Sequence, residues 1–387
     1  MVEIRTYIRH FDYALLSAVF GLIGLGLLMI YSATHADPDL PSPFYYVRVQ
    51  GIATFIGVMF MAVAAFIDFR NLGRFRVHLY VGILAMILLV MALGTTAMGG
   101  QRWISLGFFN LQPSELAKVG MILLLSSYLA ERQRGELEAQ TTLTVLGLAG
   151  VVVLLVFFQP DMGTALVLTA VTLALLFLYG TRLAHFAVIG ALGTAAMFLV
   201  FKVLPAAGVH VFHSYQVDRL LVFINPDYDP GGSGYHLLQS KIAIGSGMMT
   251  GKGLYEGTQT QLNFLPEHHT DFIFSVIGEE LGFVGAALLL ALYVIVVWRA
   301  LRIAMISDSL FGSLVAGGIL SMLLFQVFVN IGMTIGIMPI TGIPLPFVSY
   351  GGSSMVANLL AVGLLESIHV RSRLLGDRRY MRAQNAD

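Results

Sequence analysis

Asp271 stands out because its position in the sequence suggests proton-transfer chemistry. It follows Glu267 and His269 and directly precedes the long apolar run that begins at Phe272. A carboxylate at the edge of an apolar environment is costly to desolvate, which makes it a candidate proton acceptor. Asp271 or Thr270 could instead cap the following helix, because both residue types accept hydrogen bonds from first-turn N–H groups. The sequence leaves both interpretations open.

Glu115 and Lys118 form a second candidate pair, three residues apart in an apolar segment that begins at Pro113. This spacing places the two charges on one face of a helix. Pro113 suits the first helical turn, and Glu115 suits the positive end of the helix dipole. The pair could be a structural ion pair inside the membrane. Alternatively, Lys118 could bind a substrate phosphate while Glu115 orients the Lys118 side chain.

The supply of charged residues is small for a chain of this length. Of 387 residues, 57% are hydrophobic and only 11% are charged. A soluble domain carries roughly a quarter charged residues, so the composition indicates an integral membrane protein, with residues 1–387 as a single membrane domain. The zero formal charge argues against a nucleic-acid partner, and the absence of Cys excludes disulfides and thiolate metal sites.

Ten segments are long and apolar enough to cross a membrane as helices, which predicts an all-α, polytopic integral membrane protein. The gap between the fifth and sixth segments is short enough to be a re-entrant turn instead. The ten segments are Tyr13–Tyr31, Val49–Ile67, Leu79–Thr95, Pro113–Leu129, Thr142–Phe158, Met162–Leu178, Phe186–Leu204, Phe272–Trp298, Phe311–Thr334 and Ser354–Val370.

The distribution of Lys and Arg predicts how these helices are oriented. With the amino terminus inside, one side receives 15 of the 22 basic residues, and the other side or the upper membrane receives 7. The positive-inside rule then places both termini in the cytoplasm. A large extracytoplasmic loop, residues 205–271, joins the seventh and eighth segments. Its aromatic and aliphatic residues predict an ordered loop, and long ordered loops are usually functional.

Further side chains on the outer side could bind an anionic or sugar ligand. Arg48, Arg102 and Arg219 are cations where the positive-inside rule disfavours them, which suggests an anionic lipid-linked ligand. Arg48 could instead reach lipid headgroups, and Trp103 could either stack on a sugar or anchor the chain in the membrane surface. Ser349 lies in a Gly- and Ser-rich run that offers hydroxyls and close backbone approach. The six outer His residues lack zinc-ligand spacing, so no structural metal is expected.

Three separated motifs, in this order, resemble the SEDS family (shape, elongation, division and sporulation), and the similarity extends over nearly the whole chain. Two further segments, 257–267 and 330–339, resemble the elongation members of the family more than the division members, which are the close alternative. The three motifs are Gln112–Glu115, His269–Phe274 together with Gly278–Gly282, and Pro344–Ser354.

The resemblance implies a peptidoglycan glycosyltransferase in the bacterial cytoplasmic membrane that polymerises lipid II on the extracytoplasmic face, for cell elongation and shape. Its substrates would be lipid II and a lipid-linked nascent glycan. Its partners would be a class B penicillin-binding protein and other membrane proteins of the elongation complex. By position, Asp271 matches the essential aspartate of the family, and Glu115, Lys118 and Trp103 match residues in or beside its central cavity. His268 differs from the usual residue type and receives no role.

The implied reaction is an inverting attack of the acceptor GlcNAc 4-hydroxyl on the anomeric MurNAc carbon of the donor. Asp271 would act as a general base, a contribution of roughly 10²–10⁴-fold. The leaving undecaprenyl pyrophosphate needs positive charge, either from Lys118, Arg48, Arg102 or Arg219, or from a divalent cation such as Mg²⁺ or Mn²⁺ held by outer carboxylates. The sequence does not decide whether side chains or a metal ion supply this positive charge. Glu267, His269 and Ser349 are further residues assigned to the substrate site.

Two other classes of function fit the composition. A lipid II flippase or other transporter would also have ten spans with charges inside the membrane. Transporters, however, place polar sites near the midplane and often contain inverted repeats, whereas the charges here lie near the outer boundary. A non-enzymatic scaffold of the wall-synthesis complex is the third possibility, and product formed by the protein alone would distinguish it from an enzyme.

Overall fold

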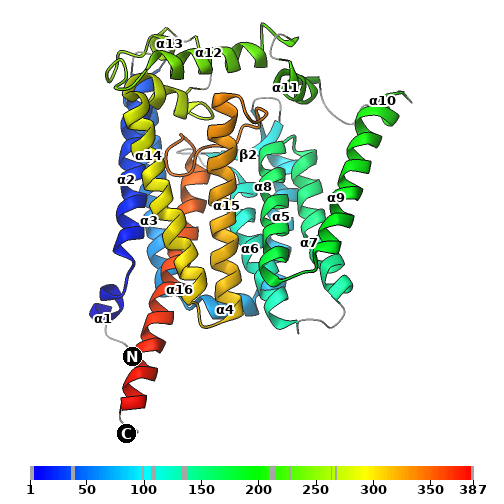
Figure 1. The fold of residues 1–387 in the computed structure, drawn as a ribbon, viewed down its shortest axis with the longest axis vertical. Coiled ribbons are helices and arrows are strands. Elements are labelled where there is room, and N and C mark those ends of the chain that lie inside the picture. Colours follow the sequence, from blue (N-terminus) through cyan, green and yellow to red (C-terminus); the bar gives the residue numbers. More distant parts are fainter. Residues whose placement is uncertain are drawn as a thin grey trace.

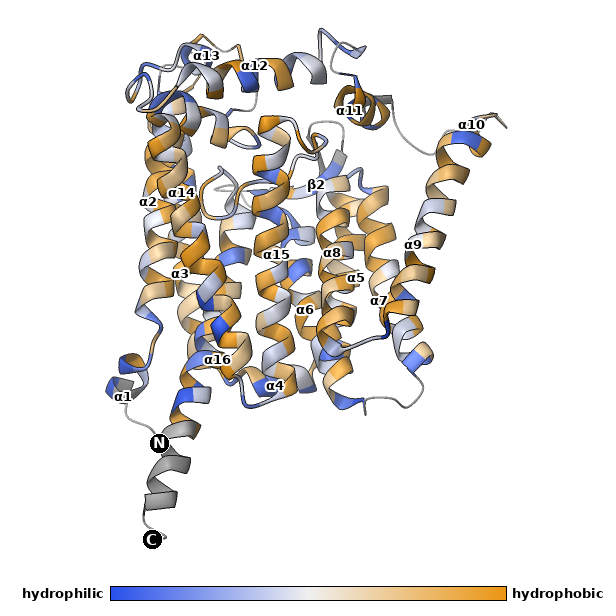
Figure 2. Cartoon of the chain, in the orientation of Figure 1, coloured by the Kyte–Doolittle hydropathy of each residue, from blue (hydrophilic) through white to orange (hydrophobic). Residues whose placement is uncertain are grey.

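The computed structural model is a bundle of long helices with shorter elements at its two ends (Figure 1). Figure 2 shows that the sides of the bundle are mainly hydrophobic and that hydrophilic residues gather toward the ends. This distribution suits a chain whose middle faces lipid hydrocarbon. The structure describes residues 4–35, 40–97, 100–105, 110–132, 138–206, 208, 214–225, 228–262, 264–265 and 268–384.

Nine helical segments within the described residues are long and apolar enough to cross a membrane. The seventh predicted segment is composite: α9 (Leu183–Phe198) continues through a π-helical turn, η1 (Leu199–Val203), into α10 (Leu204–Ala206). The other eight are α2 (Tyr13–Thr34), α3 (Tyr45–Phe66), α5 (Arg76–Leu93), α7 (Glu138–Phe158), α8 (Met162–Tyr179), α14 (Ile273–Ile306), α15 (Leu310–Ile335) and α16 (Gly352–Gln384).

The remaining predicted segment is also a helix, α6 (Pro113–Glu131), and it lies among the others in the bundle (Figure 1). It is less apolar than its neighbours because Glu115 and Lys118 occupy its first turns. The helical character of all ten predicted segments is therefore confirmed. Most of their ends differ by a few residues, whereas α14 continues to Ile306 and α16 to Gln384.

Helix α16 forms the centre of the bundle, and α9 lies at its edge. In α16, 94% of the apolar window is buried, whereas no residue of the α9 window is buried. Helix α16 packs most extensively against α3, where Gly57 and Gly363 allow the backbones to approach closely. A Cβ at Gly363 would lie 2.4 Å from the carbonyl oxygen of Met61. Small residues at helix crossings are the usual means of tight packing in membranes.

The upper end in Figure 1 contains short helices and a small antiparallel sheet. The sheet, in the order β1-β2-β3, is a difference from the all-α prediction, and in it Thr95 pairs with Trp103 and Ile104 with Leu111. It follows α5 and directly precedes α6. The elements of the upper end are β1 (Thr95–Ala97), β2 (Gly100–Ser105), β3 (Asn110–Leu111), α11 (Ser214–Ile224), α12 (Ser233–Ser246) and α13 (Thr258–Gln261).

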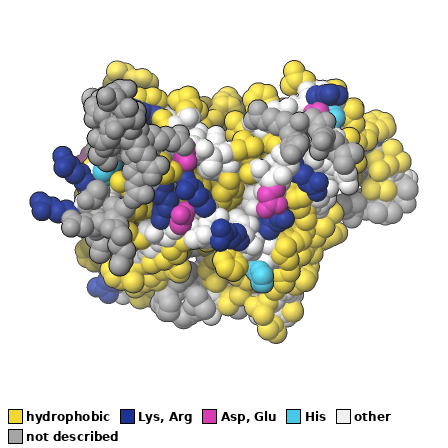
Figure 3. Space-filling model, turned by 90° about the horizontal axis from the view of Figure 1, so that it is seen from below, with side chains coloured by type: hydrophobic (Ala, Val, Ile, Leu, Met, Phe, Trp, Pro, Cys, Tyr) yellow, Lys and Arg dark blue, Asp and Glu magenta, His cyan; other side chains and the backbone are white. Residues whose placement is uncertain are grey.

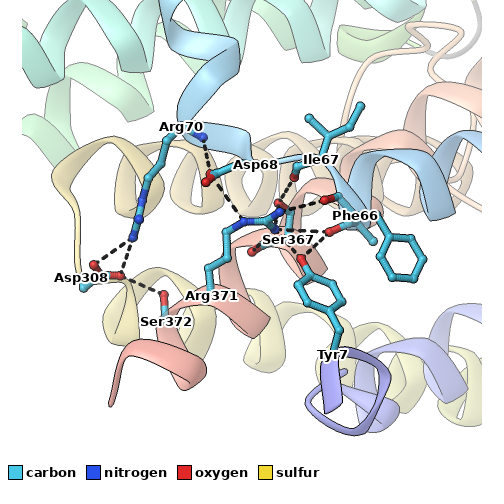
Figure 4. A network of polar contacts seen from close by, with 10 residues as sticks. Tyr7, Phe66, Ile67, Asp68, Arg70, Asp308, Ser367, Arg371 and Ser372 are labelled. Atoms are coloured by element: carbon cyan, nitrogen blue, oxygen red, sulfur yellow. Dashed lines mark hydrogen bonds and ion pairs between the residues drawn. The ribbon is translucent and has the colours of Figure 1, made fainter. Parts of the chain in front are cut away.

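The lower end carries α1 (Ile4–Arg9), α4 (Phe69–Arg74) and many basic side chains, which Figure 3 shows from below. Arg371 of α16 connects these elements (Figure 4). Its guanidinium lies 3.5 Å from Asp68, donates to the Tyr7 hydroxyl and donates to the carbonyl oxygen of Phe66 at 2.8 Å. Burial raises the pKa of Tyr7, so this phenol stays protonated and can accept from Arg371.

Candidate active site

Asp271 lies directly before the start of α14, at the upper end of the bundle. The N-cap residue of α14 is Phe272, whose side chain makes no capping hydrogen bond. Asp271 therefore stands one residue before the N-cap position of α14. Its backbone is fixed from α15, because Asn330 Nδ2 donates to the carbonyl oxygen of Asp271 at 2.9 Å and to that of Ile343 at 2.8 Å. One fully buried amide thus holds two loop segments together.

The turn at Gly342 brings the backbone against the Asp271 carboxylate. A Cβ at Gly342 would lie 3.3 Å from Oδ2 of Asp271 and 3.5 Å from Nη1 of Arg219. Gly342 has a φ of +72°, a conformation that L side chains rarely adopt. The structure therefore brings together a carboxylate and a guanidinium that are 52 positions apart in sequence, as the sequence interpretation of both residues requires.

The segment before α16 lies beside the same site. The N–H of Tyr350 donates to the carbonyl oxygen of His269 at 3.0 Å, and the rings of His269 and Tyr46 are 4.5 Å apart. Burial raises the pKa of Tyr350 to about 12, so its hydroxyl remains protonated near neutral pH. The Ser349 hydroxyl accepts from the N–H of Leu345 at 2.8 Å, so in this structure it stabilises the loop.

Gln50, which the sequence analysis did not select, holds this loop from α3. Its Nε2 donates to the carbonyl oxygen of Ser349 at 3.2 Å, and its Oε1 accepts from the N–H of Gly351 at 3.0 Å. The side chain is 1% exposed. A buried amide that pairs with both polar groups of a backbone segment fixes its position. A polar Gln inside the predicted span 49–67 is the sequence feature that could have identified it.

A second polar group surrounds Asp161, the N-cap residue of α8. Its Oδ1 accepts from the N–H of Thr164 at 3.1 Å, while its Oδ2 accepts from Gln112 Nε2 at 2.7 Å and from Ser114 Oγ at 3.0 Å. Arg102 Nη1 lies 4.0 Å from Oδ1. Arg102 is thus held beside a buried carboxylate at the top of α6 and α8. The sequence analysis did not select Asp161.

The first turn of α8 joins these two polar groups. A Cβ at Gly163 would lie 3.0 Å from the carbonyl oxygen of Thr341, next to the Gly342 turn. Gly163 is two residues after Asp161 and therefore connects the Arg102–Asp161 group with the Asp271–Arg219 group. We refer to these residues with Gln112, Ser114 and Gly342 as the upper polar site.

Glu115 and Lys118 lie in the first turns of α6, just below Ser114. Lys118 Nζ is 2.9 Å and 2.8 Å from the two carboxylate oxygens of Glu115. Lys118 is 1% exposed and Glu115 is 4% exposed. The spacing correctly predicts their pairing. As it stands, the pair is a buried ion pair, so binding a phosphate to Lys118 would require an exchange of partners.

Glu279 of α14 positions the segment that precedes the site. It is fully buried and accepts from Lys252 Nζ at 2.6 Å, from the N–H of Gln259 at 3.0 Å and from the Thr260 hydroxyl at 3.2 Å. The following residue, Glu280, accepts from Ser32 of α2 at 2.5 Å. Glu279 is therefore tightly paired, as expected for an intramembrane carboxylate, whereas Oε1 of Glu280 is buried with no hydrogen-bond partner among the described residues.

Three other predicted site residues differ in how the structure places them. Trp103 is half-buried in β2, opposite Thr95, and Arg48 is exposed on the first turn of α3. Glu267 lies outside the described residues. Within the described chain, no three His, Asp or Glu side chains gather as a metal site would require.

The fold and the site define a multi-pass membrane protein with a buried polar site near one end of its helices. A family model for cell cycle proteins of the FtsW, RodA and SpoVE type matches residues 13–374. The chain belongs to this family, the SEDS family.

Its similarity to curated relatives covers almost the full length of both chains. It is 39% identical over 366 residues to peptidoglycan glycosyltransferase MrdB of Escherichia coli K12, which covers 95% of each chain. It is 36% identical over 367 residues to stage V sporulation protein E of Bacillus subtilis, covering 94% of this chain and 98% of the other.

Solved structures support the same relationship. A chain from work on the structural coordination of polymerization and crosslinking by a peptidoglycan synthase complex matches with a TM-score of 0.78 and 31% identity, covering 94% of this chain and 98% of the other. The rod shape determining protein RodA of Thermus thermophilus matches with a TM-score of 0.66 and 29% identity, covering 93% of this chain and 96% of the other.

Proposed function

We propose that this protein is a peptidoglycan glycosyltransferase that polymerises lipid II for cell elongation and shape. The convergence of the Asp271 carboxylate and the Arg219 guanidinium on the Gly342 turn carries the proposal. A base and a cation at one point are what glycosyl transfer from a pyrophosphate donor needs. The 39% identity with a peptidoglycan glycosyltransferase over 95% of the chain supports the substrate class.

In the proposed reaction, the acceptor GlcNAc 4-hydroxyl oxygen bonds to the anomeric MurNAc carbon of the lipid-linked glycan. The bond from that carbon to the pyrophosphate oxygen breaks, and its electron pair leaves with undecaprenyl pyrophosphate. Asp271 accepts the hydroxyl proton. Attack from the face opposite the leaving group inverts the anomeric centre.

Positive charge at the upper polar site would stabilise the leaving pyrophosphate. Arg219 lies at the Gly342 turn, and Arg102 lies beside Asp161. Both are partly exposed, whereas Lys118 is buried against Glu115. We therefore assign direct phosphate contact to the two arginines first, and to Lys118 after exchange of its partner. A divalent cation would need substrate phosphate oxygens for most of its ligands, because no three His, Asp or Glu side chains gather among the described residues.

The same proposal sets the orientation in the bacterial cytoplasmic membrane. We propose ten spans, namely the nine apolar helical segments and α6. Both termini lie in the cytoplasm, and the upper polar site lies on the extracytoplasmic face. The basic lower end supports this orientation through the positive-inside rule. The ion-paired arginines of that end include Arg70, Arg76, Arg182, Arg299 and Arg371.

A class B penicillin-binding protein is the proposed partner, together with other membrane proteins of the elongation complex. The similarity to a chain of a peptidoglycan synthase complex supports a shared assembly of polymerisation and crosslinking. Helices α11, α12 and α13 and the upper ends of α14 and α15 offer the docking surface.

The decisive experiment is polymerisation of purified lipid II by the full-length protein carrying Asp271→Asn. This change keeps the side-chain shape and removes the basic carboxylate, so product should fall by roughly 10²–10⁴-fold. Glu256→Gln, at an exposed upper carboxylate, is the matched control and should polymerise normally. Normal product from folded Asp271→Asn would overturn the base role, and transport of labelled lipid II without polymer from the native protein would favour a flippase.

A further inference from the structure

The lower end of the bundle contains a polar pocket that the proposed reaction does not use. It has a volume of about 370 Å³, within the range of ligand sites in proteins. The pocket lies where the connection between α1 and α2 meets the lower ends of α14 and α16. It is lined by Arg9, His10, Phe11, Asp12, Tyr13, Ala14, Arg299, His369 and Arg373.

A buried ion pair forms one wall of this pocket. Arg299 Nε and Nη2 lie 2.6 Å and 2.5 Å from Oδ2 of Asp12. The N–H of Asp12 donates to Glu366 of α16 at 3.0 Å, so α2, α14 and α16 are joined here. Asp12 is 2% exposed and also caps α2 through the N–H of Leu15. The wall is therefore held by contacts to three helices, and the charge of Asp12 is already matched by Arg299.

The rest of the lining is positive. Asp12 is the only carboxylate among the lining residues, whereas Arg9 and Arg373 add two cations to the paired Arg299. His369 lines the pocket, is 4% exposed, and its Nδ1 has no hydrogen-bond partner among the described residues. A buried, unpartnered ring nitrogen is costly unless a ligand or water completes its hydrogen bond. An anionic ligand that forms hydrogen bonds would therefore match the charge of this lining and complete the bonding of His369.

Two exposed aromatic side chains indicate the depth of the pocket in the membrane. Tyr13 lines the pocket and is 58% exposed, and Trp298, next to Arg299, is 55% exposed. The guanidinium of Arg299 lies 5.5 Å from the centre of a Trp298 ring. Exposed Tyr and Trp residues concentrate at the level of lipid headgroups. The pocket therefore lies at the height at which phospholipid phosphates are found.

We propose that this pocket binds the phosphate of an anionic glycerophospholipid headgroup from the leaflet at the lower end. Arg9 and Arg373 contact the phosphate oxygens, and His369 completes its hydrogen bonds to the headgroup. Basic pockets between spanning helices are a known means of binding anionic lipids. Inorganic phosphate has the same charged group but lacks acyl chains in the bilayer, so it should bind much more weakly.

The test is native mass spectrometry of the purified full-length protein titrated with dioleoyl phosphatidylglycerol. The pocket variant is Arg9→Gln with Arg373→Gln, which leaves the Asp12–Arg299 pair intact. The matched control, Arg74→Gln with Arg132→Gln, removes two exposed lower-end charges outside the pocket. We expect the pocket variant to bind the lipid roughly tenfold or more weakly, and the control to bind like the native protein. Thermal unfolding confirms that both variants are folded.

Three results would overturn the proposal. Equal losses in the pocket variant and the control would indicate general attraction of anionic lipid to the basic end. Equal binding of dioleoyl phosphatidylcholine would show that the negative charge of the headgroup is not recognised. Displacement of the lipid by inorganic phosphate at equal concentration would identify a soluble phosphate site instead. Selective loss of phosphatidylglycerol binding in the pocket variant supports the proposal.

Discussion

Gly342 lies directly against the carboxylate of Asp271, because a Cβ at this glycine would stand 3.3 Å from Oδ2. The turn can approach so closely only because Gly342 has no side chain and tolerates a φ of +72°. Asn330 secures both sides of the contact, since its amide donates to the carbonyl oxygens of Asp271 and Ile343. The position of the proposed base therefore depends on two residues from other segments.

Gly342→Ala should reduce lipid II polymerisation by at least about tenfold. The new methyl group would contact Oδ2 of Asp271, and the positive φ would cost about 1–3 kcal/mol in this backbone conformation. The measurement is the initial polymerisation rate together with the melting temperature. Gly24→Ala, where a Cβ would meet nothing within 4 Å, is the control and should leave both unchanged. A Gly342→Ala protein with native rate would show that this contact does not matter.

Asp161→Ala should destabilise the protein by about 3 kcal/mol or more, because it leaves several buried donors from Gln112, Ser114 and Thr164 without an acceptor. Ser309→Ala removes the N-cap of α15, which serves a single N–H, and should cost only about 1 kcal/mol. Denaturant unfolding in detergent compares the two variants. Similar losses would mean that the network around Asp161 contributes no more than an ordinary helix cap.

Glu115 and Lys118 can be separated into structural and substrate roles by a double-mutant cycle. Glu115→Leu or Lys118→Met alone leaves a buried unpaired charge and should cost about 3–5 kcal/mol. The double variant removes both charges and should recover most of that stability. If Lys118 also binds phosphate, the recovered protein will remain inactive in the polymerisation assay. Recovery of activity with stability would limit the pair to a structural role.

Glu279→Ala should release the segment from Lys252 to Thr260 from α14. The change removes the acceptor of one ammonium, two hydroxyls and one N–H. Limited proteolysis should then cut this segment faster, and polymerisation should fall because α14 begins next to Asp271. Lys252→Met removes only the partly exposed partner and should have a smaller effect. Unchanged protease resistance of Glu279→Ala would refute the positioning role.

Tyr350 predicts a specific dependence of stability on pH. Burial raises its pKa to about 12 from the ordinary value of 10. The folded state therefore favours the neutral phenol, and this contribution is complete below pH 10. It is lost as pH rises from 10 through 12, because the unfolded chain deprotonates first. Melting temperatures at pH 9, 10 and 11 should fall less steeply for Tyr350→Phe; identical slopes would contradict the prediction.

The helices were predictable because membrane crossing depends on local properties. A run of about 20 apolar residues identifies a span wherever it lies in the chain, and all ten predicted runs are helical. The pairing of Glu115 with Lys118 was predictable for the same reason, since helix geometry fixes the distance between i and i+3. The small sheet at residues 95–111 was missed because its strands are short and follow no clear alternation.

The sequence by itself determined a membrane protein, its helical segments, its basic end and Asp271 as the residue to test. Only the tertiary structure decided that Arg219, Gly342 and Asn330 meet at this aspartate, and that Asp161 connects Arg102 with the tops of two helices. Hydropathy and helical spacing act over a few turns of one segment. The meeting of separate loops depends on how closely their helices pack, which no local pattern encodes.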